Sequence, residues 1–328
     1  MASPTLQTVV APLIDATWTL ASVSAAVESG LVAALTRPRT LAELGAETAA
    51  SPDMLLRLLD VLASVGVVTV QGEVVTPDAA LATLAGDAQA LHVLRDDLRR
   101  SLGQPRALVA DARSGLLGTA WHHTDLDVIE AQGTFARVHT RVLMVDGIVP
   151  ELPGLAARLA EPGARALDVG AGAAGNAIGF CQAWPALSVL GLEPWPASLA
   201  CGLANVTAAG LDARIELRAQ RIEELTERAA FDLIWLPQMF LDDATLARAL
   251  ELCGRALRPG GWLLTAWICD DRPGLPAALL RLRDVAFGGR ARDADRVATA
   301  LVDAGYLDVQ RKAFAGGSVG MVAGRYGR

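Results

Sequence analysis

The first third of the chain carries apolar residues at helical spacing. Residues 11–110 predict mainly helices, with a capping box at Thr40-Leu-Ala-Glu43 and an N-cap followed by proline at Ser51-Pro52. The helix that begins at Pro52 is predicted to end at Gly66. Its predicted buried residues, chosen by their helical spacing, are Met54, Leu55, Leu58, Leu59 and Leu62.

A short β-hairpin is predicted directly after that helix. Two runs of β-branched residues within 67–77 flank the turn-forming pair Gln71-Gly72. Helix, helix, hairpin is the element order of a winged helix. Its second helix carries Asp53, Arg57 and Asp60 and has no basic stripe. Contacts to phosphates would therefore be missing, and we do not expect this domain to bind DNA.

The pattern changes after about residue 155, where strand-like apolar runs alternate with amphipathic helical stretches. This alternation predicts an α/β domain with a parallel sheet and helices on both faces. Two further strands flank Gly316-Gly317 near the end and are expected to be antiparallel. The other predicted strands lie at 165–170, 187–193, 214–219, 231–236 and 261–267.

A joint between two domains is predicted near residue 150. Gly147, Pro150 and Pro153 interrupt the helical pattern there. We therefore expect a mainly helical domain at 1–150 and the sheet domain at 151–328.

Composition and charge narrow the functional classes. The net charge is −7, from 36 acidic and 29 basic residues among 328, which argues against a nucleic-acid partner. The N-terminus has no basic segment before an apolar block, and no run of about 18 apolar residues is free of charge. Neither a signal peptide nor a membrane partner is therefore expected. The four cysteines lack metal-ligand spacing, which favours free thiols, a cytoplasmic location and no metal site.

The glycines Gly170, Gly172 and Gly175 follow the first predicted strand of the sheet domain. Such a loop lies at the carboxyl edge of a parallel sheet, where ligands bind. A phosphate-binding P-loop would need Lys and Ser or Thr after the last glycine, but Asn176 and Ala177 stand there. A loop that merely turns the chain is the alternative without a ligand.

Two nucleoside cofactors remain. For NAD, Glu193 at the end of the second strand is placed to bind the ribose, but Asp168 just before the loop and the antiparallel end of the sheet argue against it. S-adenosylmethionine has no phosphate and carries an ammonium, which Asp168 can orient. Glu193 can accept hydrogen bonds from both ribose hydroxyls. The residues therefore favour S-adenosylmethionine.

Four segments in this order resemble the successive motifs of class I S-adenosylmethionine-dependent methyltransferases: ALDVGAG at 166–172, GLEP at 191–194, FDLIWL at 231–236 and LRPGGWLL at 257–264. The helical first domain resembles the dimerisation domain of the small-molecule O-methyltransferases, and the resemblance covers roughly 11–325. It implies a Rossmann-like seven-stranded sheet with an antiparallel last strand. It also implies a homodimer formed through the N-terminal winged-helix domain, which also covers the substrate.

The resemblance assigns residues to the cofactor by position. Asp168, Gly170, Ala171 and Gly172 would contact the methionine portion. Glu193 would hold the ribose, with Pro194 and Trp195 near the adenine, and Gln220 and Arg221 would flank the base. Leu236, Pro237 and Gln238 would line the floor near the transferred methyl, with Gln238 toward the substrate.

The chain departs from the family pattern at three places. The third glycine often stands at Ala174 rather than Gly175, and an acid often stands at Gln220 or Arg221. Many plant-type members also have a catalytic histidine where this chain has Leu241, and no histidine follows residue 139.

His122 and His123 beside Trp121 are the candidate catalytic base and substrate contacts, with a solvated loop or an interface pair as the alternative reading. Trp18 is a candidate substrate contact in a partner subunit or a residue of the dimer core. His139 is expected to be structural, and Asp242 and Asp243 are expected to cap a helix.

These observations predict methyl transfer to a small, aromatic or polyketide-like metabolite, at oxygen first and at nitrogen or carbon second. The missing histidine motivates an alternative, in which the enzyme keeps the cofactor but performs pericyclic, hydroxylating or decarboxylating chemistry.

Overall fold

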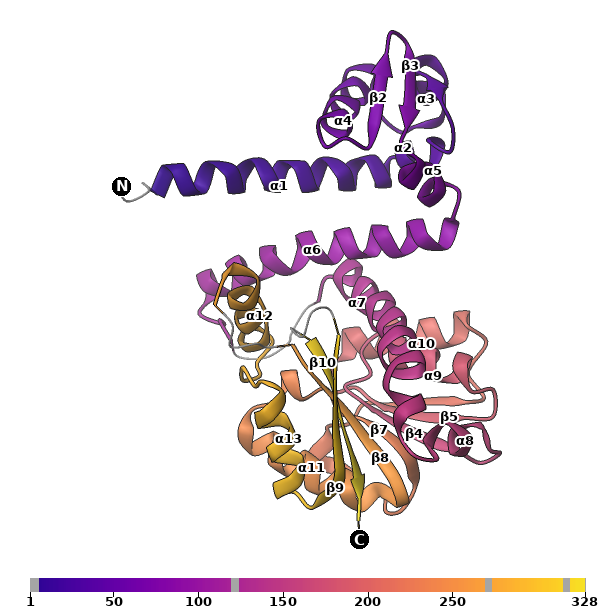
Figure 1. Ribbon diagram of the computed structural model, residues 1–328, viewed down its shortest axis with the longest axis vertical. Helices are drawn as coiled ribbons and strands as arrows, with labels where there is room; N and C mark the ends of the chain where they lie inside the picture. The colour runs from indigo at the N-terminus through magenta and orange to yellow at the C-terminus, as the bar shows by residue number, and fades with distance from the viewer. Residues whose placement is uncertain (1–5, 119–123, 269–272, 315–318, 328) are drawn as a thin grey trace. The chain divides into compact units, whose positions relative to one another are not determined.

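The computed structural model describes residues 6–118, 124–268, 273–314 and 319–327 (Figure 1). The chain divides into two compact units, Met1–Arg106 and Ala107–Arg328. This division lies within one helix and comes before the joint predicted at residue 150. The helical segments within 126–148 belong to the second unit because they pack on its sheet domain, where Gly133 contacts Ala173.

The first unit holds most of the helices predicted for 11–110 and the predicted hairpin. The three strands pair in the order β1-β3-β2, and the β2–β3 pair is antiparallel around Gly72, which has φ +60°. Its elements are α1 (Leu6–Glu28), α2 (Leu31–Ala34), β1 (Arg39–Thr40), α3 (Leu41–Glu47), α4 (Pro52–Ser64), β2 (Val68–Gln71), β3 (Val74–Pro77), α5 (Ala79–Ala85) and α6 (Ala88–Ser114).

The local signals for α3 and α4 are confirmed. The Thr40 side chain accepts from the Glu43 N–H, and the Glu43 carboxylate accepts from the Thr40 N–H, as a capping box requires. Ser51 caps α4, because its side chain accepts from the Met54 N–H. The prediction that Met54 is buried is wrong, since it is 53% exposed. It precedes the buried stripe Leu55, Leu58, Leu59 and Leu62, and one helical step of about 100° turns it outward.

The second unit is built on a seven-stranded sheet in the order β6-β5-β4-β7-β8-β10-β9. Strands β4 to β8 are parallel to one another, and β10 runs antiparallel to both β8 and β9, as predicted. The strands are β4 (Arg165–Val169), β5 (Ser188–Leu192), β6 (Ile215–Arg218), β7 (Phe231–Trp235), β8 (Leu257–Trp267), β9 (Tyr306–Phe314) and β10 (Val319–Tyr326). The predicted Gly316-Gly317 turn lies outside the described residues.

Helical segments surround this sheet (Figure 1). They are α7 (Leu126–His139), a π-helical segment η1 (Thr140–Ile148), η2 (Val149–Glu151), α8 (Leu155–Ala160), α9 (Gly175–Ala183), α10 (Pro196–Ala208), η3 (Ile222–Glu224), η4 (Gln238–Phe240), α11 (Asp243–Ala256), α12 (Leu275–Ala286) and α13 (Ala294–Asp303).

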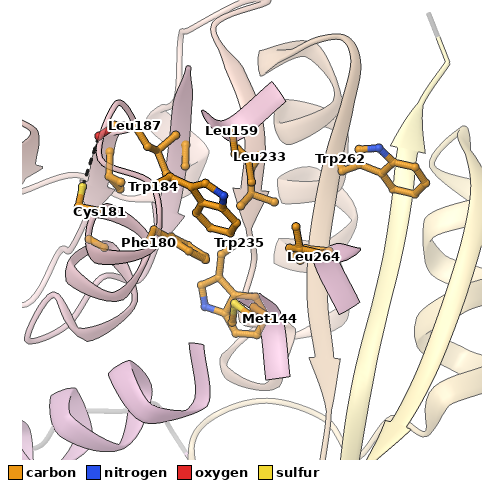
Figure 2. Packing of buried hydrophobic residues seen from close by; sticks show 14 of the residues in the cluster. Met144, Leu159, Phe180, Cys181, Trp184, Leu187, Leu233, Trp235, Trp262 and Leu264 are labelled. Atoms are coloured by element: carbon orange, nitrogen blue, oxygen red, sulfur yellow. Dashed lines mark hydrogen bonds between the residues drawn. The ribbon is translucent and has the colours of Figure 1, made fainter. Parts of the chain in front are cut away.

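Alternate residues of the central strands pack into two separate hydrophobic cores, one on each face of the sheet. Ala166, Leu233 and Leu264 pack with α8, α9 and η1 on one face, where Phe180, Trp184 and Trp235 fill the space (Figure 2). Leu167 and Ile234 pack with α11 and α13 on the other face. A strand buried on both faces cannot tolerate polar side chains along its length, so the polar groups gather at the strand ends.

Candidate active site

The turn from β4 into α9 has an unusual backbone. Gly170, Gly172 and Ala174 all have positive φ, at +65°, +55° and +63°. Glycine adopts this region freely, whereas alanine there is strained by roughly 1–2 kcal/mol. Gly175 is needed for a different reason, because a Cβ on it would overlap the carbonyl oxygen of Gly133 on α7. Gly175, one position after the usual third glycine, is therefore required for the close packing of α7 on α9.

Asp168 is fully buried where β4 ends, in the middle of the sheet. It pairs with Gly191 of β5 and Trp235 of β7. Its carboxylate accepts from the Ala177 N–H at 3.1 Å and from the Asn176 amide at 3.4 Å. Burial raises the pKa of Asp168 to about 7, against the lowering effect of these two hydrogen bonds, and the Glu193 charge raises it further. A buried cation beside Asp168 would stabilise its charged form.

Glu193 follows β5 and is 4% exposed. One carboxylate oxygen accepts from the Gly172 N–H at 2.8 Å, and the other accepts from the Trp195 N–H at 2.8 Å. Burial raises the pKa of Glu193, and the two hydrogen bonds oppose this effect. Each carboxylate oxygen has a second lone pair, so the group can still accept two hydroxyls from one ligand.

The chain at the end of β6 lies beside Glu193, because the Glu193 N–H donates to the Arg218 carbonyl. Gln220 uses its amide locally, donating to the Glu224 carbonyl at 2.9 Å. Arg221 is exposed, and its backbone N–H donates to the Glu224 carboxylate at 3.0 Å. Ala171 donates its N–H to Leu192 and is nearly buried, whereas Pro194 is partly exposed. The roles of these residues toward the adenine stay predictions.

Leu236, Pro237 and Gln238 follow β7, the strand next to β4. Pro237 lies 3.5 Å from the position that a Cβ on Gly170 would occupy, so the floor meets the glycine loop. Gln238 is fully buried and already engaged, donating to the Ala266 carbonyl at 2.9 Å and accepting from Arg292 at 2.9 Å. A substrate contact through Gln238 would have to use its remaining hydrogen-bonding capacity.

The residues predicted as catalytic base, substrate contacts or structural groups lie in different parts of the chain. Trp121, His122 and His123 lie outside the described residues. Trp18 belongs to the first unit and is 71% exposed.

His139 stacks on Phe135, with ring centroids 3.7 Å apart, in keeping with a structural role. Asp242 caps α11 by accepting from the Thr245 N–H, as predicted.

Two buried charged residues near the floor could not be recognised from the sequence. Arg292 is 5% exposed and donates to the backbone after β7, and Asp284 at the end of α12 is fully buried. The apolar period of α12 points away from Asp284, because Leu279 and Leu282 on that helix are themselves exposed. The sequence pattern therefore gives no signal that either charged side chain is buried. Among the residues that the structure describes, no three His, Cys, Asp or Glu side chains could together hold a metal ion.

Comparison with known proteins agrees with this geometry. Residues 166–261 match the model of a methyltransferase domain family. No curated protein matches the chain. Three solved structures are similar over nearly the whole chain. An O-methyltransferase family protein from Burkholderia thailandensis has a TM-score of 0.73 at 20% identity, covering 99% of each chain.

Human N-acetylserotonin methyltransferase in complex with S-adenosylmethionine has a TM-score of 0.71 at 18% identity, covering 100% of this chain and 99% of that one. The mitomycin 7-O-methyltransferase MmcR has a TM-score of 0.62 at 24% identity, covering 98% and 97%. Likenesses at these identities establish the fold, and the family model covers the segment that contains Asp168, the glycine loop and Glu193. The chain therefore contains a methyltransferase domain and has the fold of the class I S-adenosylmethionine-dependent methyltransferases.

Proposed function

We propose that this protein transfers the methyl group of S-adenosylmethionine to an oxygen of a small organic acceptor. The observation that carries the proposal is the pair of buried carboxyls, Asp168 and Glu193, on either side of a glycine loop at the carboxyl edge of the sheet. Two of the similar structures are of a mitomycin 7-O-methyltransferase and of N-acetylserotonin methyltransferase, and both names specify a small-molecule acceptor.

The residues fit the cofactor by their chemistry. Asp168 is a buried carboxyl that gains from a neighbouring cation, and Glu193 keeps lone pairs for a ribose diol. Without a Cβ, Gly170 and Gly172 let the backbone approach the methionine portion. S-adenosylmethionine supplies a methyl group already activated on a sulfonium, so the protein contributes mainly by orienting the acceptor and excluding water. In this proposal Leu236 and Pro237 form the apolar floor that does so.

Cofactor affinity is expected to fall as the pH drops below 7. Burial raises the pKa of Asp168 to about 7, so its carboxyl is largely ionised at pH 8 and largely protonated at pH 6. Only the ionised form pairs with an ammonium, so S-adenosylhomocysteine should bind about tenfold more weakly at pH 6 than at pH 8. Calorimetry at both pH values measures this ratio. Asp168→Asn should bind weakly with little pH dependence, and an unchanged ratio in that variant contradicts the assignment.

The alternative function is conversion of an acceptor without methylation. It is favoured by one observation, that Leu241 occupies the place of the usual histidine base. The acceptor oxygen would then lack a proton acceptor at the usual position.

A label-transfer assay separates these two functions. The full-length protein is incubated with methyl-labelled S-adenosylmethionine and a panel of phenols, catechols and hydroxyquinones, and the products are analysed by mass spectrometry. Label in an ether product supports O-methyl transfer. Conversion of an acceptor without gain of label supports the alternative, and label on nitrogen or carbon removes the oxygen assignment while keeping methyl transfer.

We further propose a cytoplasmic homodimer formed through α1. Val9, Leu13 and Trp18 are exposed apolar residues along this helix, and the hydroxyls of Thr17 and Ser22 are satisfied by backbone carbonyls four residues earlier, as suits a covered surface. By length and composition alone Gln7–Glu28 could also cross a membrane, since it has a mean hydropathy of 1.4.

Asp15 stands near the middle of α1, and a charge at the centre of a bilayer costs roughly 3 kcal/mol, which favours a second copy of the chain as the occupant. Sedimentation velocity tests the proposal. Trp18→Lys should produce a monomer, while the control Val302→Lys, at an exposed position on α13, should not. A dimer that persists in Trp18→Lys contradicts the proposal.

A further inference from the structure

Asp284 is a buried carboxyl whose hydrogen-bonding capacity is poorly satisfied. The residue is fully buried near the C-terminal end of α12, and neither carboxylate oxygen makes a hydrogen bond of good geometry, although the Arg292 backbone N–H lies near the group. Burying a polar group without a hydrogen bond is costly. The end of the helix adds to this cost, because negative charge is unfavourable near a helix C-terminus. Protein interiors rarely keep such a group unless it has a use.

The surroundings of Asp284 belong to the active-site floor. Gly289 approaches the Met239 carbonyl so closely that a Cβ on it would overlap the oxygen, and the Asp284 carbonyl lies 3.3 Å from the same Cβ position. Phe287 and Phe240 stack with centroids 5.6 Å apart. The end of α12 therefore packs on η4, the turn that follows β7.

Arg292 is the cation that influences Asp284, but its guanidinium makes its hydrogen bonds to other groups. Its guanidinium donates to the Gln238 carbonyl at 3.2 Å and to the Gln238 amide oxygen at 2.9 Å. It also donates to the Leu241 carbonyl at 3.1 and 3.2 Å and to the Asp243 carboxylate at 2.5 and 3.2 Å. These contacts use the donors of the guanidinium and fix the floor turn, so they leave Asp284 without a salt bridge.

We propose that Asp284 binds the hydroxyl of the methyl acceptor and takes its proton during transfer. The inference rests on the proposed O-methyl transfer. Asp284 would then be the proton acceptor beside η4, a role that Leu241, at the place of the usual histidine, cannot fill.

The step balances in charge and atoms. The O–H bond of the acceptor breaks and its proton goes to an Asp284 carboxylate oxygen. An oxygen lone pair forms the bond to the methyl carbon, and the C–S electron pair stays on sulfur. A cationic sulfonium, a neutral hydroxyl and a carboxylate become a thioether, a methyl ether and a carboxylic acid.

The environment suits a base that works near neutral pH. Burial raises the pKa of Asp284 to about 7, while the Arg292 backbone N–H and the Arg292 charge act in the opposite direction. The neighbouring turn η4 contributes Gln238, Met239 and Phe240, which do not titrate. Asp243 on α11 is the nearest acid described around Arg292, and it is bonded to that arginine. A base whose pKa is close to the working pH is the most effective.

The test compares Asp284→Asn with the wild type on two probes, phenol and 4-nitrophenol. Phenol enters with its proton and needs a base, whereas 4-nitrophenol is already ionised at pH 8. Asp284→Asn should lower kcat with phenol about a hundredfold or more and change kcat with 4-nitrophenol much less. With phenol, kcat of the wild type should fall toward acidic pH, and this fall should disappear in the variant. Affinity for S-adenosylhomocysteine should stay unchanged.

Asp284→Leu is a second variant that shows whether a loss of turnover comes from misfolding. Asp303→Asn, at an exposed acid on α13, is the matched control and should leave turnover unchanged. A residue that only costs stability would raise the melting temperature when replaced and leave kcat unchanged. That result overturns the inference while leaving O-methyl transfer in place. Absence of any ether product from the wild type overturns the proposed function and this inference together.

Discussion

Replacing Glu193 by alanine is expected to weaken S-adenosylmethionine and S-adenosylhomocysteine binding about a hundredfold. The carboxylate is buried at the rim of the glycine loop, where it accepts from the Gly172 and Trp195 N–H groups and keeps lone pairs for two ribose hydroxyls. Hydrogen bonds to a charged group contribute about 1.5–3 kcal/mol each. A loss of about 3 kcal/mol corresponds to a factor of about a hundred in affinity.

Calorimetry measures the change in affinity. The choice of ligand separates the two roles of Glu193, which are binding the ribose and supporting the glycine loop. An S-adenosylhomocysteine analogue without ribose hydroxyls should bind wild type and Glu193→Ala with similar affinity if the ribose is the contact that is lost. If loop support is the main task, both ligands should weaken equally. Glu216→Ala on β6 is the control, because it removes an exposed glutamate that pairs with Arg218. Affinity for the full ligand within twofold of wild type in Glu193→Ala removes the ribose assignment.

The features that sequence predicts well here are those with a local physical cause. The capping box at Thr40 requires two residues three positions apart, and both are visible in the sequence. The acidic pair could also be predicted, because Asp168 and Glu193 end consecutive strands that meet at one edge of a parallel sheet. The alternation of strands and helices is enough to place that edge.

The features that sequence did not predict depend on contacts between distant segments. Gly175 gives no sign that it faces Gly133 on another helix, and the early start of β8 at Leu257 depends on pairing with Phe231. Arg292 and Asp284 resemble surface residues in the sequence, because arginine and aspartate are mostly exposed in proteins. Only the fold shows that Arg292 is surrounded by floor carbonyls and that Asp284 is buried without a hydrogen bond of good geometry.

Replacing Asp232 by alanine is expected to lower the free energy of unfolding by about 3–5 kcal/mol. Asp232 lies near the start of β7 and is 2% exposed. Its carboxylate accepts from Arg158 at 2.6 Å, from Arg258 at 2.7 Å and from the Arg165 N–H at 2.9 Å. One side chain thereby joins α8, β4 and β8 at the edge of the sheet opposite the cofactor site. Removing it leaves two partly buried guanidiniums and an amide without their shared acceptor.

Scanning calorimetry should show this loss as a fall of the melting temperature by about 10 °C for a domain of this size. Asp295→Ala on α13 is the matched control, because it breaks an exposed ion pair with Arg311 and should cost about 1 kcal/mol or less. Since Asp232 and Glu193 lie at opposite ends of the parallel strands, Asp232→Ala should bind S-adenosylhomocysteine normally at low temperature. Equal losses in the two variants would mean that water replaces the carboxylate, and a large loss of affinity would mean that this edge of the sheet also shapes the cofactor site.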